Sequence, residues 1–261
     1  MSGGRTPVGG VESEFGVPIP GVIRPEAEWT RTGIKRLPPA GPLDWSALFG
    51  RDAPVVLELG CGNGRYLLHS ALRRPEIDHI GIDILPVVIR YATRRANHRG
   101  LTNVRFAVKD AETFVRDYLA PESVAEIHLY HPQPYHDRRQ WRRRLVTPEV
   151  LVNVHRALAR DGLFVFQTDE PAYWEYVVRV APVFFTFAEH PGPWPDAPEG
   201  RSRREILARQ RGFRIDRGVG RRRESLDWDA VRRLPRPDFQ TTRATEALDR
   251  IEEPDTRRSG R

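Results

Sequence analysis

A glycine loop that follows a carboxylate is the part of the sequence whose residue types and spacing could do chemistry. The apolar run Val55–Leu59 contains one acid, Glu58, and leads directly into Gly60, Gly62 and Gly64. Such a run is typical of a strand that is buried on both faces of a parallel sheet. Glycine lets the backbone turn sharply and approach a ligand closely, because it has no Cβ. A helical pattern begins directly after the loop, so the spacing predicts a ligand site between a strand and a helix.

Two further acids follow the next two apolar runs. Asp83 stands near the end of His79–Ile84, and Asp110 comes just after Val104–Val108. An acid in the first of these places suits a ribose, because a carboxylate accepts the hydrogens of both hydroxyl groups. A glycine turn that only packs is the alternative interpretation. Three acids in register, one within or near the end of each of the first two strands and one just after the third, favour a nucleoside-containing cofactor instead.

Two cofactors fit this outline. A dinucleotide site requires G-x-G-x-x-G, in which the third glycine allows close packing of helix and strand. Arg65 stands at that position, and the sequence instead reads E-x-G-x-G-x-G. This pattern resembles the first motif of the S-adenosylmethionine (SAM) methyltransferases. In such a site Glu58, or its hydrogen-bond partners, can meet the cationic methionine end of the cofactor.

A second candidate region is the loop that follows the predicted strand Glu126–Tyr130. It reads His131-Pro132-Gln133-Pro134-Tyr135, and its two prolines make it stiff. A stiff loop at the edge of a sheet can hold a polar side chain beside a flat base, with an aromatic ring to stack on it. Five arginines in seven residues follow, at positions 138–144. A charge run is usually a solvated face, but its place beside the predicted cofactor favours an RNA partner.

The composition points in the same direction. The 261-residue chain has a formal net charge of +7, and its only lysines are Lys35 and Lys109. Arginine binds phosphate with two hydrogen bonds and stacks on bases, which favours a nucleic-acid partner, although a GC-rich genome would also favour arginine over lysine. The single cysteine, Cys61, excludes an internal disulfide, and no apolar run approaches the roughly 18 residues of a membrane span. These features, and an N-terminus without the apolar core of a signal peptide, predict a cytoplasmic protein.

The elements that must position these residues alternate along the chain. The predicted strands are Val55–Leu59, His79–Ile84, Val104–Val108, Glu126–Tyr130 and Leu163–Thr168. The predicted helices are Trp45–Phe49, Tyr66–Arg73, Val87–His98, Glu112–Tyr118 and Pro148–Leu158. This alternation predicts an α/β fold with a mostly parallel, doubly wound sheet and helices on both faces. We expect an extended arm over residues 1–50, one domain over 51–223, and a charged, mostly disordered tail over 224–261.

Most of the chain, from about Arg31 to Arg222, resembles the bacterial tRNA (guanine-N7)-methyltransferase family, which methylates a guanine of the variable loop. The family's F-P-D-P-W corresponds to His131–Tyr135. Its K-R-R-L-V-Q, T-D-W/P-E-x-Y, T-x-x-E and R-G-x-R-L-x-x-G-V motifs correspond to Arg142–Thr147, Thr168–Tyr173, Ser202–Glu205 and Arg211–Val219. The resemblance implies a Rossmann-like SAM methyltransferase with tRNA as its partner.

The resemblance also implies residue roles. The cofactor would contact Glu58, Gly60, Gly62, Asp83, Asp110 and Ala111. The substrate would contact Tyr135, Arg138, Asp169, Ser202, Arg203 and Glu205. Gln133 stands where the family has its loop aspartate, which is assigned as catalytic, and Tyr135 replaces the loop tryptophan. N7 of guanine has a free lone pair, so the transfer needs alignment with the methyl group and no general base.

Three alternatives stay open at this point. The chain could be a SAM-dependent enzyme that acts on another RNA base, or one that acts on a small molecule. It could also be a non-enzymatic RNA-binding protein, because Gln133 departs from the family pattern. The scattered His69, His98 and His155 lack the cysteine or carboxylate spacing of a metal site, so we expect no metal. We expect a monomer.

Overall fold

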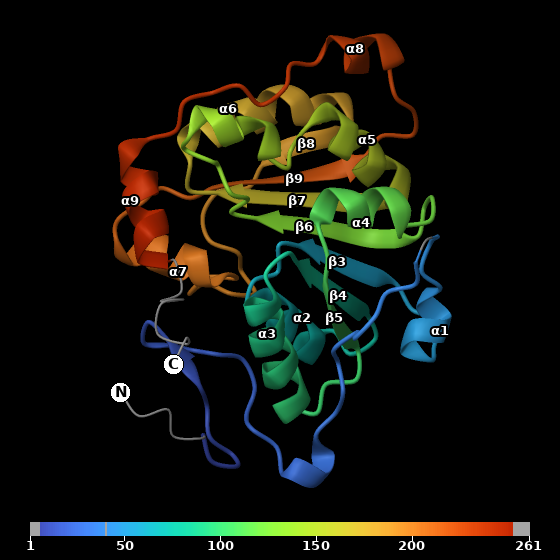
Figure 1. Ribbon diagram of the computed structural model, residues 1–261, viewed down its shortest axis with the longest axis vertical. Helices are drawn as coiled ribbons and strands as arrows, with labels where there is room; N and C mark the ends of the chain where they lie inside the picture. The colour runs from blue at the N-terminus through green and yellow to red at the C-terminus, as the bar shows by residue number, and fades with distance from the viewer. Residues whose placement is uncertain (1–5, 40, 253–261) are drawn as a thin grey trace.

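The centre of the molecule is a seven-stranded sheet (Figure 1), in a computed structural model that describes residues 6–39 and 41–252. The strands are β3 (Val55–Leu59), β4 (Asp78–Asp83), β5 (Val104–Val108), β6 (Val124–Tyr130), β7 (Leu158–Thr168), β8 (Phe185–Glu189) and β9 (Asp216–Arg222). Their spatial order is β5-β4-β3-β6-β7-β9-β8. The first five run parallel, and β9 pairs antiparallel with both β7 and β8. The predicted α/β class and mostly parallel sheet are confirmed.

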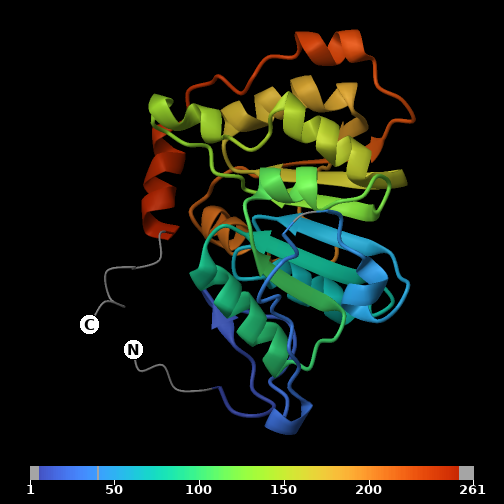
Figure 2. The same ribbon diagram turned by 45° about the vertical axis from the view of Figure 1, so that its right-hand side comes forward.

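Helices cover both faces of the sheet. The helices α2 (Arg65–Arg73) and α3 (Pro86–His98) share one apolar core with residues of β3, β5, β6 and β7. On the other face a second core joins the sheet to α4 (Ala111–Asp117), α5 (Pro148–Ala157) and α6 (Pro171–Val180). Figure 2 shows the two layers on either side of the sheet. The strand order reverses between β3 and β6, and ligands of doubly wound sheets bind at the carboxyl edge beside such a reversal.

The strands and helices form where local signals agree with burial. All five residues of β3 are buried, as in a parallel strand with helices on both faces. Pro86 and Pro148 occupy the first turns of α3 and α5, where their missing N–H has no partner to lose. The hydroxyl of Thr147 accepts a hydrogen bond from the Val150 N–H and caps α5.

The last two strands of the sheet, β8 and β9, were not predicted. The β9 sequence is rich in arginine and glycine, which are poor strand signals. Its glycines are needed for packing, because a Cβ on Gly218 would lie 2.2 Å from the ring of Phe187. A Cβ on Gly220 would lie 2.6 Å from Cβ of Phe185. The aromatic side chains of β8 therefore fill the space that the β9 glycines leave free.

The N-terminal arm has more structure than the one predicted helix. The helix α1 (Trp45–Phe49) is present as expected. The arm also forms a short hairpin of β1 (Ser13–Glu14) and β2 (Val17–Pro18), and a 3-10 helix η1 over Glu26–Glu28. Phe15 and Gly16 both have positive φ, which is the backbone of a tight hairpin turn.

The predicted disorder of the C-terminal tail is wrong for the part that the structure describes. Residues 224–252 contain α8 (Trp228–Arg233) and α9 (Arg243–Glu252). Specific polar contacts hold this segment where apolar residues are few. Arg144 donates to the carbonyl of Pro237 at 2.9 Å, and Glu170 accepts the Thr242 N–H at 3.0 Å. The remaining tail, 253–261, lies outside the described residues.

Candidate active site

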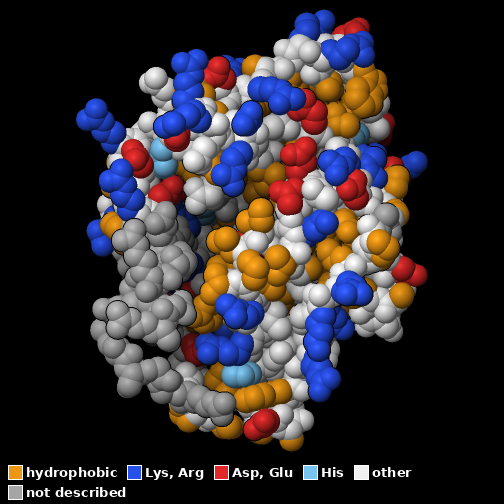
Figure 3. All heavy atoms as spheres, in the orientation of Figure 1, with side chains coloured by type: hydrophobic (Ala, Val, Ile, Leu, Met, Phe, Trp, Pro, Cys, Tyr) orange, Lys and Arg blue, Asp and Glu red, His pale blue; other side chains and the backbone are white. Residues whose placement is uncertain are grey.

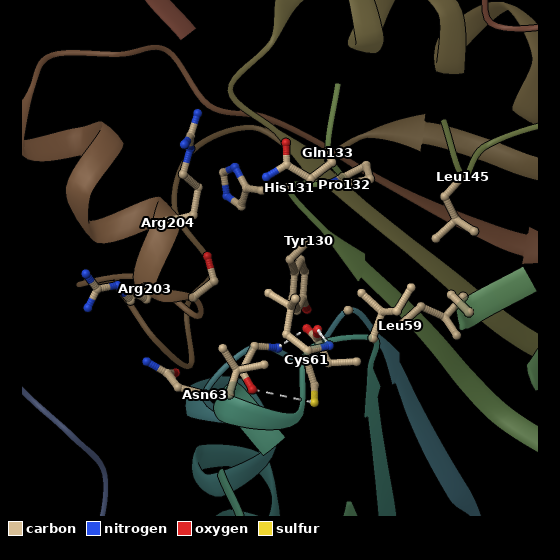
Figure 4. Close-up of a pocket in the computed structure, with 18 of the residues that line it drawn as sticks. Leu59, Cys61, Asn63, Tyr130, His131, Pro132, Gln133, Leu145, Arg203 and Arg204 are labelled. Atoms are coloured by element: carbon tan, nitrogen blue, oxygen red, sulfur yellow. Dashed lines mark hydrogen bonds between the residues drawn. The ribbon is translucent and has the colours of Figure 1, made fainter. Parts of the chain in front are cut away.

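One cavity of about 970 Å³ opens at the carboxyl edge of β3, β4, β5 and β6. Figure 3 shows a hollow on this side of the molecule, and the close-up in Figure 4 shows Cys61 and Asn63 of the glycine loop below the cavity and Pro132 and Gln133 of the Pro-rich loop above it. Many predicted site residues line it: Glu58, Gly60, Gly62, Asp83, Asp110, Ala111, Gln133, Tyr135, Ser202 and Arg203. Arg138, Asp169 and Glu205 are not among the lining residues.

The glycine loop and Asp83 fix each other at the ends of β3 and β4. The carboxylate of Asp83 accepts the Gly62 N–H at 3.0 Å and the Leu85 N–H at 2.9 Å. Gly62 and Gly64 have positive φ, and a Cβ on Gly64 would lie 2.9 Å from Cβ of Ala92. Gly64 therefore has to be glycine for α2 to begin this close to α3.

Among the described residues, no cationic side chain forms an ion pair with the carboxylate of Glu58 or Asp83. Glu58 is 2% exposed, and its Oε2 has no hydrogen-bond partner among the described residues. Burial raises the pKa of Glu58 well above its ordinary value, and the charge of Asp83 raises it further, while Arg201 opposes the shift. Burial also raises the pKa of Asp83, although its backbone hydrogen bonds oppose this. A positively charged or hydroxyl-bearing ligand would stabilise both groups in their ionised form.

Asp110 sits at the matching place after β5. Its side chain accepts the Thr113 N–H at 2.8 Å and caps α4, and Ala111 is the first residue of that helix. One oxygen of Asp110 thus supports the helix, and both residues line the cavity. This is an accessible acid beside a helix N-terminus.

The Pro-rich loop is held in a constrained conformation by Arg144. His131 and Tyr135 have φ of 49° and 48°, in the left-handed region that such residues seldom adopt. The Arg144 guanidinium donates to the carbonyl of Pro134 at 2.6 Å and to that of Tyr135 at 3.2 Å. It also lies 3.7 Å from the ring centre of Phe239, which joins the loop to the C-terminal segment.

The structure divides the five arginines of positions 138–144 into two kinds. Arg138, Arg139, Arg142 and Arg143 are exposed, on or beside the 3-10 helix η2 (Arg138–Arg143). Arg143 lines the cavity, 4.9 Å from the ring centre of Tyr135. Arg144 is 1% exposed, and burial lowers its pKa to about 10. Our inclusion of Arg144 in a surface run was therefore wrong, because this side chain is part of the core.

Asp169 lies behind the cavity wall and holds two residues that form it. His131 Nδ1 lies 2.7 Å from one oxygen of Asp169, and Arg204 donates to the other at 2.7 Å. Burial raises the pKa of Asp169, but the hydrogen bond from His131 and the charge of Arg204 outweigh it, so the pKa is lowered.

The neighbours of Gln167 fix the hydrogen-bond roles of the two His131 ring nitrogens. The Gln167 side-chain oxygen accepts from Trp194 Nε1 at 2.5 Å and from Arg217 Nε at 3.0 Å. Its amide nitrogen is therefore a donor, and it lies 2.7 Å from His131 Nε2. His131 thus accepts at Nε2 and donates from Nδ1 to Asp169, so hydrogen bonds occupy both of its ring nitrogens.

Ser202–Glu205, the counterpart of the family's T-x-x-E, begins α7 (Arg203–Gln210). The Ser202 hydroxyl accepts the Glu205 N–H at 3.0 Å, as in a helix cap. The Glu205 carboxylate is fully buried and accepts from Arg217 at 2.5 Å and from Gln167 at 3.0 Å. Burial raises its pKa, but the contacts with Arg217 and Gln167 outweigh this, so the pKa is lowered. Glu205 anchors α7 and does not face the cavity.

No motif or periodicity in the sequence predicts the part of the cavity wall that α9 contributes. Glu246, Asp249 and Arg250 line the cavity from one face of this helix. Asp249 accepts from His136 at 2.9 Å and forms an ion pair with Arg204, so α9 is joined to both the Pro-rich loop and α7. Figures 1 and 2 show α9 beside α7. A distant, charged segment carries no motif that would place it here.

No group of three or more potential metal ligands occurs within 6–39 and 41–252. No helix in these ranges is long and apolar enough to cross a membrane.

Comparisons with known proteins agree on one family. The profile of a family described as "Putative methyltransferase" matches residues 52–208. A tRNA (guanine-N(7)-)-methyltransferase from Pseudoalteromonas atlantica is 32% identical over 74% of this chain and 80% of its own length. One of the same name from Leifsonia xyli subsp. xyli is 39% identical over 62% of this chain and 72% of its own. Among solved structures, the 16S rRNA methyltransferase KamB has a TM-score of 0.54 at 16% identity, covering 74% of this chain and 98% of that one, which shows the shared fold.

Proposed function

This chain belongs to the tRNA (guanine-N(7)-)-methyltransferase family and transfers a methyl group from SAM to N7 of a guanine in tRNA, and we propose that this guanine lies in the variable loop. The resemblance of its Pro-rich loop and following motifs to enzymes with that target supports the proposal. We further propose that residues 51–223 form the catalytic domain and that the protein works as a monomer in the cytoplasm, where its tRNA substrate is modified.

The cofactor fits the lower half of the cavity. We propose that Asp83 accepts hydrogen bonds from the ribose hydroxyls and that Asp110 and Ala111 meet the adenine. The Glu58 carboxylate would face the positive charge of the methionine end, which restores its ordinary ionisation. The glycine loop would let the cofactor approach the backbone at Gly60 and Gly62. SAM supplies an activated methyl group on its sulfonium.

The target base fits the upper half. We propose that Gln133 hydrogen-bonds the guanine edge and that the Tyr135 ring stacks beside the base, while Arg143, Ser202 and Arg203 contact the nucleotide. Arg138 would contact the RNA backbone beside the loop. Asp169 and Glu205 would act only through the residues that they hold, namely His131, Arg204 and Arg217.

The reaction requires positioning and no proton transfer. The N7 lone pair attacks the methyl carbon in line with the departing sulfur, and N7 carries no proton to remove. His131 is a candidate for a general base in the loop, but both of its ring nitrogens are already in hydrogen bonds. The enzyme therefore has to hold N7 at attack distance, and the stiff loop provides that constraint.

One observation carries this proposal: a single cavity joins Glu58, Asp83 and Asp110, which lie at or just past the carboxyl ends of β3, β4 and β5, to Gln133 and Tyr135. The test is nucleoside mass spectrometry of tRNA after incubation with the protein and isotopically labelled SAM. We expect labelled 7-methylguanosine, and we expect it to disappear when the variable-loop guanine alone is replaced by adenine. A tRNA with 7-deazaguanine at that position is the matched control, because it keeps the base shape and lacks N7.

Label that persists after the replacement would contradict the variable-loop assignment while leaving the activity intact. Gln133, in place of the family's aspartate, favours one second candidate, methylation of another RNA base. Labelled nucleosides other than 7-methylguanosine would identify it.

A further inference from the structure

A second basic and aromatic surface lies beside the cavity, on the side of α3 that faces the N-terminal arm. A groove of about 310 Å³ runs between them, and Trp29, Arg90, Arg94 and His98 are among its lining residues. No aspartate or glutamate of the described residues lines it. The groove is separate from the cavity of about 970 Å³, and the catalytic roles proposed above do not involve it.

The groove is preformed, because hydrogen bonds attach the arm to α3. The Asn97 side-chain oxygen accepts the Thr32 N–H at 2.8 Å and the Thr32 hydroxyl at 2.9 Å. The hydroxyl of Thr30 donates to the carbonyl of Leu101 at 2.8 Å. A ligand in this groove would therefore not have to order the arm first.

The chemistry of the groove suits a nucleotide. Trp29 stacks on His98 with ring centres 3.9 Å apart, and its Nε1 donates to the carbonyl of Arg24, which fixes the indole. Arg90 is exposed, and the Arg94 side chain is 52% exposed beside Glu12, 3.6 Å away. Arginines beside a fixed aromatic ring bind single-stranded RNA, because the charges attract phosphates and the ring stacks on bases.

The position of the groove connects it to the active site. Val87, Val88 and Tyr91 of α3 line the main cavity, while Arg90 and Arg94 line the groove. At 1.5 Å per residue, Val87 and His98 are separated by roughly 16 Å along the helix, which a few nucleotides can span. Figure 3 shows arginine and histidine side chains over this part of the molecule, below the apolar side chains that border the hollow.

We propose that this α3–arm surface, defined by Trp29, Arg90, Arg94 and His98, is a tRNA-binding surface. It binds the tRNA backbone outside the target nucleotide, with an unpaired base against the aromatic pair. The tRNA then spans two basic regions, the exposed arginines of η2 and this surface, with the cavity between them. The proposal rests on the tRNA activity and not on the assignment of the variable loop.

The test compares two double variants that each remove two arginine charges. Arg90→Gln/Arg94→Gln should weaken tRNA binding roughly tenfold to hundredfold at low salt and reduce the slope of log affinity against log salt by about two, one for each lost phosphate contact. S-adenosylhomocysteine affinity should not change. The control is Arg160→Gln/Arg232→Gln. Arg160 lies near the amino end of β7 and Arg232 on α8, and both side chains are exposed ion-pair partners.

A second comparison addresses the aromatic part. Trp29→Ala should weaken tRNA binding roughly tenfold through lost stacking, while Trp29→Phe should retain most of it. Equal affinity and equal salt dependence for the two double variants would overturn the proposal, and so would wild-type affinity in Trp29→Ala. If the variants differ in tRNA affinity as expected but the methylated guanine lies outside the variable loop, only the proposed target is contradicted.

Discussion

Two buried glutamates of opposite character lie at one end of the cavity and behind the other. Glu58, at the end proposed for the cofactor, is 2% exposed, and its Oε2 has no hydrogen-bond partner among the described residues. Glu205, behind the substrate end, is fully buried and receives hydrogen bonds from Arg217, Gln167 and the Arg201 N–H. Burial raises the pKa of Glu58, whereas the partners of Glu205 lower its pKa in spite of burial.

This difference separates binding groups from supporting groups. A buried carboxylate without an internal cation is costly unless a ligand supplies the charge, so Glu58 is suited to bind one. A buried carboxylate whose partners are all protein groups has no free oxygen to offer, so Glu205 and Asp169 shape the wall. Both kinds look alike in the sequence, because each is an acid near the end of a strand or the start of a helix.

The largest expected effect is on stability at the substrate end. Glu205→Ala should lower the free energy of unfolding by about 3–5 kcal/mol, because it leaves Arg217 buried without its partner. Denaturant unfolding followed by circular dichroism measures the change. Glu58→Gln is the matched control and should not destabilise the protein, because it removes a buried charge that has no internal cation. A Glu205→Ala protein as stable as wild type would remove the basis of the comparison.

The next effect concerns cofactor binding. Glu58→Gln should weaken binding of S-adenosylhomocysteine by about 1.5–3 kcal/mol, through loss of a charged hydrogen bond to the ammonium group. Asp169→Asn should leave this affinity unchanged, because Asp169 does not line the cavity. Isothermal titration calorimetry measures both. Equal losses in the two variants would show that the two ends are not distinct.

The raised pKa of Glu58 also predicts a pH dependence of stability and of cofactor binding. The raised pKa of Glu58 means that the folded protein keeps a proton which the unfolded chain has lost, so this group contributes less stability as pH rises from about its ordinary value toward the raised pKa. A cationic cofactor favours the ionised form, so its binding should release a proton in that range. Affinity should then rise with pH by at most about tenfold per unit. Titrations in two buffers of different ionisation enthalpy detect the proton, and Glu58→Gln should reduce the release to what Asp83 contributes.

The pH dependence of stability has the opposite sign for Asp169. Its lowered pKa contributes stability that is present above the ordinary aspartate pKa and is lost as pH falls through the folded value. The free energies of unfolding of wild type and Asp169→Asn should therefore converge as the pH is lowered. Constant separation of the two curves down to strongly acidic pH would contradict the assignment.

The sequence predicted the cofactor end better than the substrate end, for a physical reason. The strands β3–β7, the glycine loop and the acids are local: each is specified by a few adjacent residues whose burial or turn follows from their own types. The substrate end depends on contacts between distant segments. Arg144 looks like its exposed neighbours, yet it is buried because the carbonyls of Pro134 and Pro237 surround it.

The same reason explains why β9 and α9 were missed. The glycines of β9 make sense only once Phe185 and Phe187 of β8 lie against them. Asp249 of α9 has a role only because His136 and Arg204 reach it from other elements. Periodicity and composition contain none of this information, and a charged sequence with few apolar residues suggests disorder until its partners are known.

The smallest expected effect concerns Gln133, which stands where the family has its loop aspartate. Gln133 is exposed at the cavity and would orient a guanine edge through one neutral hydrogen bond. Gln133→Ala should therefore raise the activation free energy by about 0.5–1.5 kcal/mol and so lower turnover. The pH profile of turnover should stay flat near neutrality. Gln133→Asp should retain or raise activity, since it restores the side chain that the family uses. Steady-state kinetics on tRNA with saturating SAM gives both values.

A pH-dependent loss in Gln133→Ala would mean that the loop moves a proton after all. An inactive wild type beside an active Gln133→Asp would mean that the glutamine has switched off an otherwise complete site, and that the substrate end, unlike the cofactor end, no longer performs its chemistry.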